Sequence, residues 1–167
     1  MNENRFWEII GLSRAGNENS QAAQKAKLKQ LLTGLEASEV IAFDKIFDQT
    51  LYASYTWDLW GAAYIINGGC SDDSFEYFRR GLIASGRQNF ADALQDPQTL
   101  GDWVEPDELE FEDIKYAVYD VYNQKTGTTD IPNHGLKPPS SPAGDPWEED
   151  SDELEKRFPR LWAKFSA

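Results

Sequence analysis

The chain has 167 residues, of which 40% are hydrophobic and 13% aromatic, and it carries a formal net charge of −13. This length and apolar content predict one folded domain and exclude a wholly disordered chain, while the single cysteine excludes an intramolecular disulfide framework. A chain this acidic repels phosphate groups, so neither a nucleic acid nor a membrane surface is expected as its partner.

Helical patterns follow one another along residues 1–127. Apolar residues at helical spacing predict helices at about 5–13, 20–32, 38–51, 55–66, 71–86, 88–94 and 111–122. Ser20 and Ser71 stand where they can cap helix starts, and Gly34 and Gly127 where they can end helices. Because no alternating pattern indicates a strand, we predict an all-α fold, a compact single-domain bundle of about six or seven helices.

The composition changes at residue 128. Five of the eight prolines lie in residues 128–150, which predicts an extended, acidic Pro/Gly-rich connection. Residues 151–167 resume an apolar pattern through Leu154, Phe158 and Leu161, and Pro159 either starts or breaks the helix there. We expect this C-terminal helix to pack back on the helical core of residues 1–127, and a mobile aromatic tail is the alternative.

The negative charge is distributed unevenly. Residues 101–167 contain 16 acidic and 7 basic residues, and the acids concentrate in two runs, 105–113 and 145–153. These clusters favour a basic protein partner, although high solubility alone also explains them. Mimicry of a nucleic acid fits less well, because a mimic presents regularly spaced carboxylates. The single thiol and the lack of a signal-peptide or membrane-spanning pattern predict a cytoplasmic location.

No residues form a recognisable catalytic or metal-binding motif. Cys70 precedes a predicted helix start, where the helix dipole lowers the pKa of a thiol, but Asp72 and Asp73 oppose that effect. The only histidine, His134, lies in the Pro-rich connection, which would have to fold over Cys70 to make a Cys–His pair. Asp72, Asp73 and Glu76 could share a helix face and bind a cation, although acids at a helix start more often stabilise the helix. We therefore predict no catalytic residue, no metal site and no cofactor.

The densest unusual cluster lies in residues 55–64. Trp57 and Trp60 share a helical face, Asp58 lies between them, and Gly61 permits another segment to approach closely. Arg79 and Arg80 form a local positive pair that could bind a carboxylate or a phosphate. Packing in the core and ion pairing with nearby acids are the plainer interpretations of these two features. The candidate binding residues are Trp57, Asp58, Trp60, Asp72, Asp73, Arg79 and Arg80.

The run YTWDLWGAAYIINGGCSDDSFEYFRRGLIASGR, residues 55–87, resembles the signature block of a bacterial family of unknown function, the one numbered 4240. Residues 4–10 and 158–162 also resemble the ends of that family. The resemblance implies a small, bacterial, cytoplasmic and mainly helical domain, and it implies no reaction, cofactor or catalytic residue. It directs attention to Trp57, Asp58, Trp60, Gly61, Asn67, Cys70, Asp72 and Asp73.

Two classes of function fit these patterns. The first is a non-catalytic acidic interaction module, of an immunity or regulatory type, that binds a basic protein partner. The second is an enzyme or small-ligand binder with a pocket around Trp57, Asp58, Asp72, Arg79 and Arg80. The charge distribution and the lack of a catalytic motif favour the first.

Overall fold

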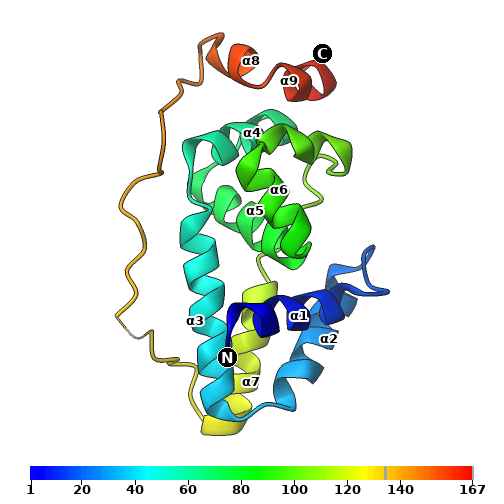
Figure 1. Cartoon of the computed structure of the whole chain (residues 1–167), viewed down its shortest axis with the longest axis vertical. Coiled ribbons are helices and arrows are strands. Elements are labelled where there is room, and N and C mark those ends of the chain that lie inside the picture. The colour runs from blue at the N-terminus through cyan, green and yellow to red at the C-terminus, as the bar shows by residue number, and fades with distance from the viewer. Residues whose placement is uncertain (134, 167) are drawn as a thin grey trace.

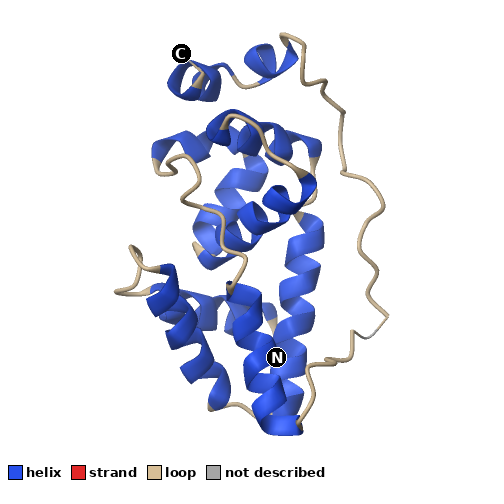
Figure 2. Cartoon of the chain, turned by 180° about the vertical axis from the view of Figure 1, so that it is seen from behind, coloured by secondary structure: helices blue, strands red, loops and turns tan. Residues whose placement is uncertain are grey.

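The described part of the chain consists of helices and loops. The computed structural model describes residues 1–133 and 135–166, and no β-strand occurs among them (Figure 2). The predicted all-α fold is therefore confirmed. No helix in these two ranges is long and apolar enough to cross a membrane. His134, considered above as a partner for Cys70, lies outside the described residues.

The helices are α1 (Glu3–Arg14), α2 (Gln21–Thr33), α3 (Ala37–Ala53), α4 (Trp57–Asn67), α5 (Asp72–Ala84), α6 (Arg87–Gln95), the 3-10 helix η1 (Pro97–Asp102), α7 (Ile114–Thr126), α8 (Glu153–Arg157) and α9 (Pro159–Phe165).

Short polar side chains and glycines set several of the helix limits. The hydroxyl groups of Ser20, Thr56 and Ser71 each accept a hydrogen bond from the backbone N–H three residues further on, at the starts of α2, α4 and α5. Gly68 and Gly127 end α4 and α7 with left-handed backbone angles, φ +67° and +82°. These ends suit glycine, because a side chain is strained in that conformation.

Helix α3 runs through both halves of the molecule (Figure 1). In one half α3 packs with α1 and α7, and α2 packs against both of those helices. In the other half α3 contacts α5, which in turn contacts α4 and α6. The buried side chains form one continuous hydrophobic cluster across both halves. Its largest fully buried aromatic side chains are Phe6, Phe43, Phe47, Phe75 and Phe78.

The loop between η1 and α7 lies directly against α5. A Cβ atom on Gly81 would stand only 1.5 Å from the carbonyl oxygen of Leu109, so the backbone of the loop occupies the space that a side chain would need. The backbone N–H of Phe111 donates a 3.0 Å hydrogen bond to the carbonyl of Tyr77 beside this contact. Leu109 and Phe111 are buried, and the close approach at Gly81 therefore holds the acidic run 105–113 against α5.

The Pro-rich connection passes beside α3 and returns the chain to α4 (Figure 1). Ala143 forms two backbone hydrogen bonds of 2.9 Å, one donated to Tyr55 and one accepted from Trp57. Residues 143–166, here called the C-terminal strap, continue from this point, and α9 contacts α4 and η1. Leu161 of the strap is fully buried. The predicted C-terminal helix is two short helices, because Pro159 starts α9 with its fixed φ angle and without a backbone N–H.

One group of charges is buried between α3 and α7. The Lys115 ammonium lies 2.5 Å from the Asp44 carboxylate and 2.6 Å from that of Asp48, and its side chain is 3% exposed. Burial alone would lower the pKa of Lys115, but the two carboxylates outweigh it and raise that pKa above its ordinary value. Lys115 therefore stays charged and joins the two helices through its acidic partners.

Candidate functional site

Six aromatic side chains meet where α4, α5 and the C-terminal strap come together. Trp60 stacks on Trp57 with ring centroids 5.7 Å apart and on Phe75 at 5.1 Å. Trp147 of the strap stands edge-on to Trp57, and its indole N–H donates a 2.7 Å hydrogen bond to the Trp57 carbonyl oxygen. We call this group the aromatic cluster: Tyr55, Trp57, Trp60, Tyr64, Phe75 and Trp147. Trp57 and Trp60 therefore have a packing role, because the strap packs against both of them through Trp147.

Gly61 and Asp58 also serve the contact with the strap. A Cβ atom on Gly61 would lie 2.9–3.1 Å from side-chain atoms of Leu154, Phe158 and Trp147, so the absence of a side chain lets the strap sit close to α4. The Asp58 carboxylate accepts a 3.2 Å hydrogen bond from the Arg157 guanidinium. Asp58 therefore lies at the surface and helps to fix the strap, instead of lining a pocket.

A cavity of about 170 Å³ lies between the end of α3 and the start of α5, and we call it the Arg79 pocket. Three predicted binding residues, Asp72, Asp73 and Arg79, line it. The other four predicted residues lie elsewhere: Trp57 and Trp60 in the aromatic cluster, Asp58 at the strap, and Arg80 on another side of α5. The lining residues are Leu51, Tyr52, Tyr55, Asp72, Asp73, Glu76, Arg79, Pro138 and Pro139.

Arg79 forms the buried wall of this pocket. Its guanidinium group lies 4.7 Å from the ring centroids of both Tyr55 and Phe75, and its Nη1 donates a 2.9 Å hydrogen bond to the Leu51 carbonyl oxygen. The residue is 6% exposed, and its Nε atom has no hydrogen-bond partner among residues 1–133 and 135–166. Burial lowers the pKa of Arg79, against the attraction of Glu76 and other nearby charges.

Carboxylates of α5 line the exposed part of the same pocket. Asp72 and Asp73 are exposed in the first turn of α5, where negative charge stabilises a helix, and Glu76 follows one turn later. The Tyr55 hydroxyl donates a 3.0 Å hydrogen bond to Asp72, and burial together with this contact raises the pKa of Tyr55. Within the described ranges, no group of three or more acidic, His or Cys side chains is arranged to hold a metal ion.

Arg80 and Cys70 take no part in the pocket. Arg80 donates a 2.8 Å hydrogen bond to the Glu112 carbonyl oxygen and lies 3.5 Å from the Glu76 carboxylate. Of the two arginines, Arg80 therefore forms the ion pair with a nearby acid, while Arg79 lines the pocket. Burial raises the pKa of the Cys70 thiol to about 12, so this thiol is not activated at neutral pH.

Acidic side chains from three distant parts of the sequence gather around the C-terminal end of α4. The backbone N–H of Asp107 donates a 2.9 Å hydrogen bond to the Asn67 side chain, which holds the run 105–113 at this end. Burial and, after it, the charges of Glu149 and Asp150 raise the pKa of Tyr64, so the strap brings its own acids to α4. We call this surface the acidic face, and its exposed carboxylates are Asp72, Asp73, Asp107, Glu148, Glu149 and Asp150.

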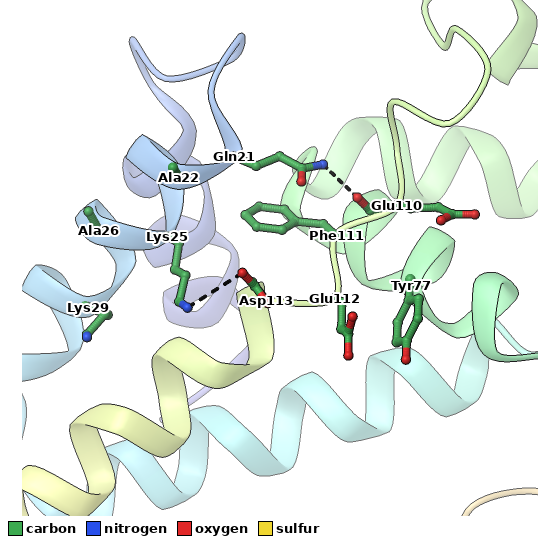
Figure 3. Close-up of a pocket in the computed structure, with 10 residues that line it drawn as sticks. All are labelled: Gln21, Ala22, Lys25, Ala26, Lys29, Tyr77, Glu110, Phe111, Glu112 and Asp113. Carbon is green, nitrogen blue, oxygen red and sulfur yellow. Dashed lines mark hydrogen bonds and ion pairs between the residues drawn. The ribbon is translucent and has the colours of Figure 1, made fainter.

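A wider groove of about 720 Å³ lies between α2 and residues 110–113 (Figure 3). In the figure Lys25 of α2 points across the groove toward Asp113, 4.0 Å away, and Gln21 donates a 2.8 Å hydrogen bond to the Glu110 carbonyl oxygen. Lys29 lies 3.2 Å from Asp120. The cations of this groove therefore already have acidic partners, and the sequence patterns gave no reason to single them out.

Sequence reasoning missed several residues of both sites. Tyr55 lines the Arg79 pocket, and Pro138 and Pro139 close it from the connection more than 60 residues along the chain from Asp72. Trp147 completes the aromatic cluster from a segment without helical spacing. No local pattern marks these residues, since their roles depend on the path of residues 128–150.

Comparison with known proteins yields one match. A family model described as a protein of unknown function, DUF4240, matches residues 1–124. The matched range includes α1 to α6 and most of α7, together with all the residues of the Arg79 pocket except Pro138 and Pro139. No curated protein and no solved structure matches the chain.

Proposed function

The chain belongs to the DUF4240 family of proteins of unknown function, and we propose that it is a non-catalytic interaction module whose acidic face binds a cationic segment of a protein partner. This is the mode of action of an immunity-type or regulatory protein that neutralises a basic partner. A bacterial cytoplasmic location fits the single, half-buried thiol.

The convergence of three acidic segments on one face carries the proposal. Residues 72–73, 107 and 148–150 are far apart in the sequence, yet all three segments lie around α4 and the start of α5. The cations beside this face are already engaged: Arg79 is buried, Arg80 is mostly buried and paired with Glu76, and Lys164 lies 3.9 Å from Glu105. Negative potential is therefore little offset there, and it would attract a Lys- or Arg-rich segment from a distance.

The aromatic cluster adds a second feature suited to a cationic partner. Trp57, Trp60 and Tyr64 are half-buried, and Glu149 and Asp150 lie near Tyr64. Aromatic rings attract ammonium and guanidinium groups, and rings beside carboxylates favour both groups more strongly than a carboxylate alone. Tryptophan and tyrosine are also frequent at the residues that contribute most to protein interfaces.

A short polylysine peptide tests the proposal by nuclear magnetic resonance titration at low and high salt. We expect backbone amide shifts to concentrate at 70–76, 105–113 and 147–151 and to weaken at high salt. Shifts spread evenly over all carboxylates, or concentrated on α1 and α3, would contradict it.

A triple variant with a matched control sharpens the test. Asp107→Asn, Glu148→Gln and Glu149→Gln together remove three charges from the acidic face and none from the Arg79 pocket. Each exposed ion pair contributes roughly 0.5 kcal/mol, so we expect affinity for the peptide to fall about tenfold at low salt. Glu8→Gln, Glu39→Gln and Asp130→Asn change the net charge equally at exposed positions outside that face. An equal loss of affinity in this control would show that net charge alone determines binding.

A further inference from the structure

Arg79 is a buried cation without an anionic partner. No carboxylate of residues 1–133 or 135–166 lies within ion-pair distance of its guanidinium, although the side chain is 6% exposed. Within the described part of the chain, Nη1 alone has a hydrogen-bond acceptor, the Leu51 carbonyl oxygen, and Nε–H has none. Buried charges in proteins are normally paired, and a guanidinium group offers five N–H donors. The unmet donors therefore indicate that an acceptor is missing.

The pocket beside Arg79 has the dimensions of a small ligand. Its volume is about 170 Å³, and a water molecule takes roughly 30 Å³ of liquid, so there is room for on the order of six non-hydrogen atoms. Leu51, Tyr52 and the two prolines, Pro138 and Pro139, give it apolar walls. Walls of this kind with a few polar groups are typical of binding sites for small molecules.

The charges lining the pocket restrict the chemistry of the ligand. A plain anion would pair with Arg79 but would be repelled by Asp72, Asp73 and Glu76, which line the same cavity. A plain cation would pair with these acids but would leave Arg79 without an acceptor. A small molecule with a carboxylate at one end and an ammonium at the other satisfies both sides.

We propose that the Arg79 pocket binds a small zwitterionic ligand of the α-amino-acid class, with its carboxylate on the Arg79 guanidinium and its ammonium among Asp72, Asp73 and Glu76. The Tyr55 hydroxyl donates a hydrogen bond to the Asp72 carboxylate and so holds the side chain of Asp72 at the pocket. This inference goes beyond the proposed protein interaction and does not rest on it. The two sites share Asp72 and Asp73, but the inference rests on the buried Arg79, whereas the proposed interaction rests on exposed carboxylates.

Isothermal titration calorimetry with four probes tests the inference: glycine, L-alanine, acetate and methylammonium. We expect glycine or L-alanine to bind at least about tenfold more tightly than either singly charged probe, since each lacks one charge-assisted contact. In a nuclear magnetic resonance titration, the Arg79 Nε–H signal should shift at saturation with the zwitterion. Absence of binding by both amino acids would overturn the inference, and so would acetate or methylammonium binding as tightly as they do.

Substitutions at the exposed acids avoid the risk that a change of Arg79 prevents folding. The double variant Asp72→Asn and Asp73→Asn keeps side-chain size and the acceptor for Tyr55, and we expect it to weaken amino-acid binding about tenfold or more. Asp102→Asn, an exposed acid of η1 outside the pocket, should bind as the original chain does. Unchanged affinity in the double variant would refute the ammonium site. The acidic-face triple variant described above should retain amino-acid binding, which separates this inference from the proposed function.

Discussion

Replacing Gly81 with alanine sets two effects of opposite sign against each other. Alanine favours a helix interior over glycine by roughly 0.8–1.0 kcal/mol. The new Cβ would stand 1.5 Å from the Leu109 carbonyl oxygen, so the loop would have to retreat by about 1.9 Å to restore an ordinary contact of 3.4 Å. Adding a methyl group to a filled space lowers the free energy of unfolding by about 1–3 kcal/mol. The upper value applies here because the atom that must move belongs to the backbone, which is less mobile than a side chain. We expect a net loss of about 2 kcal/mol in the free energy of unfolding.

Urea denaturation of Gly81→Ala beside Gly11→Ala measures this balance. A Cβ atom on Gly11 in α1 meets nothing within 4 Å, so that variant should gain roughly 0.5–1 kcal/mol. For a chain of this size the melting temperature should fall by about 4–8 °C in the first variant and rise by about 1–4 °C in the second. Because the loop carries the acidic run 105–113, Gly81→Ala should also weaken binding of the polylysine peptide.

Equal gains in stability for the two variants would refute the reasoning. They would mean that the loop moves away from α5 without cost and that the close approach at Gly81 is not required by the fold.

Four further outcomes are expected. Lys115→Met should lower the free energy of unfolding in urea by about 3–5 kcal/mol, because two carboxylates are left without their buried partner. Folding raises the pKa of Lys115, so the stability that its charge contributes is complete below the ordinary pKa of 10.5 and is lost as the pH rises through the raised value. In alkaline buffer the original chain should therefore lose stability more steeply than Lys115→Met. Cys70, with its pKa near 12, should react with iodoacetamide at pH 8 far more slowly than a free cysteine, and rapid alkylation there would contradict its burial. Trp147→Phe removes the hydrogen bond to the Trp57 carbonyl, and faster proteolysis within 128–150 should follow from a loosened strap, whereas unchanged cleavage would show that this bond does not fix it.

Local chemistry made most of the helices predictable. The hydroxyl of Ser71 and the left-handed backbone at Gly127 act within one turn of their own helix, so their residue types suffice to place the ends of α5 and α7. The start of α3 differs slightly: the helix begins at Ala37, one residue before the predicted start at 38, because Glu36 caps it together with Glu39.

Long-range partners explain what sequence reasoning could not predict. Asp58 was expected near a pocket, yet its partner is Arg157, 99 residues away, and nothing local indicates that pairing. Arg79 and Arg80 are neighbours in the sequence, but successive helix positions point about 100° apart, so one faces the pocket and the other does not. The predicted binding residues therefore include three that line the Arg79 pocket and omit the other six that line it.

The hydrogen bond between Trp147 and Trp57 joins residues 90 positions apart, and this separation has a consequence for the order of folding during synthesis. At about 5–20 residues per second, a ribosome adds Trp147 roughly 5–20 seconds after Trp57. Throughout that interval α4 presents its tryptophans and the gap at Gly61 to the surrounding medium, since the strap that covers them does not yet exist. The strap, which is made after α4, thus completes the packing around that helix. If synthesis stops before residue 143, the nascent chain exposes an apolar surface that the strap would otherwise cover.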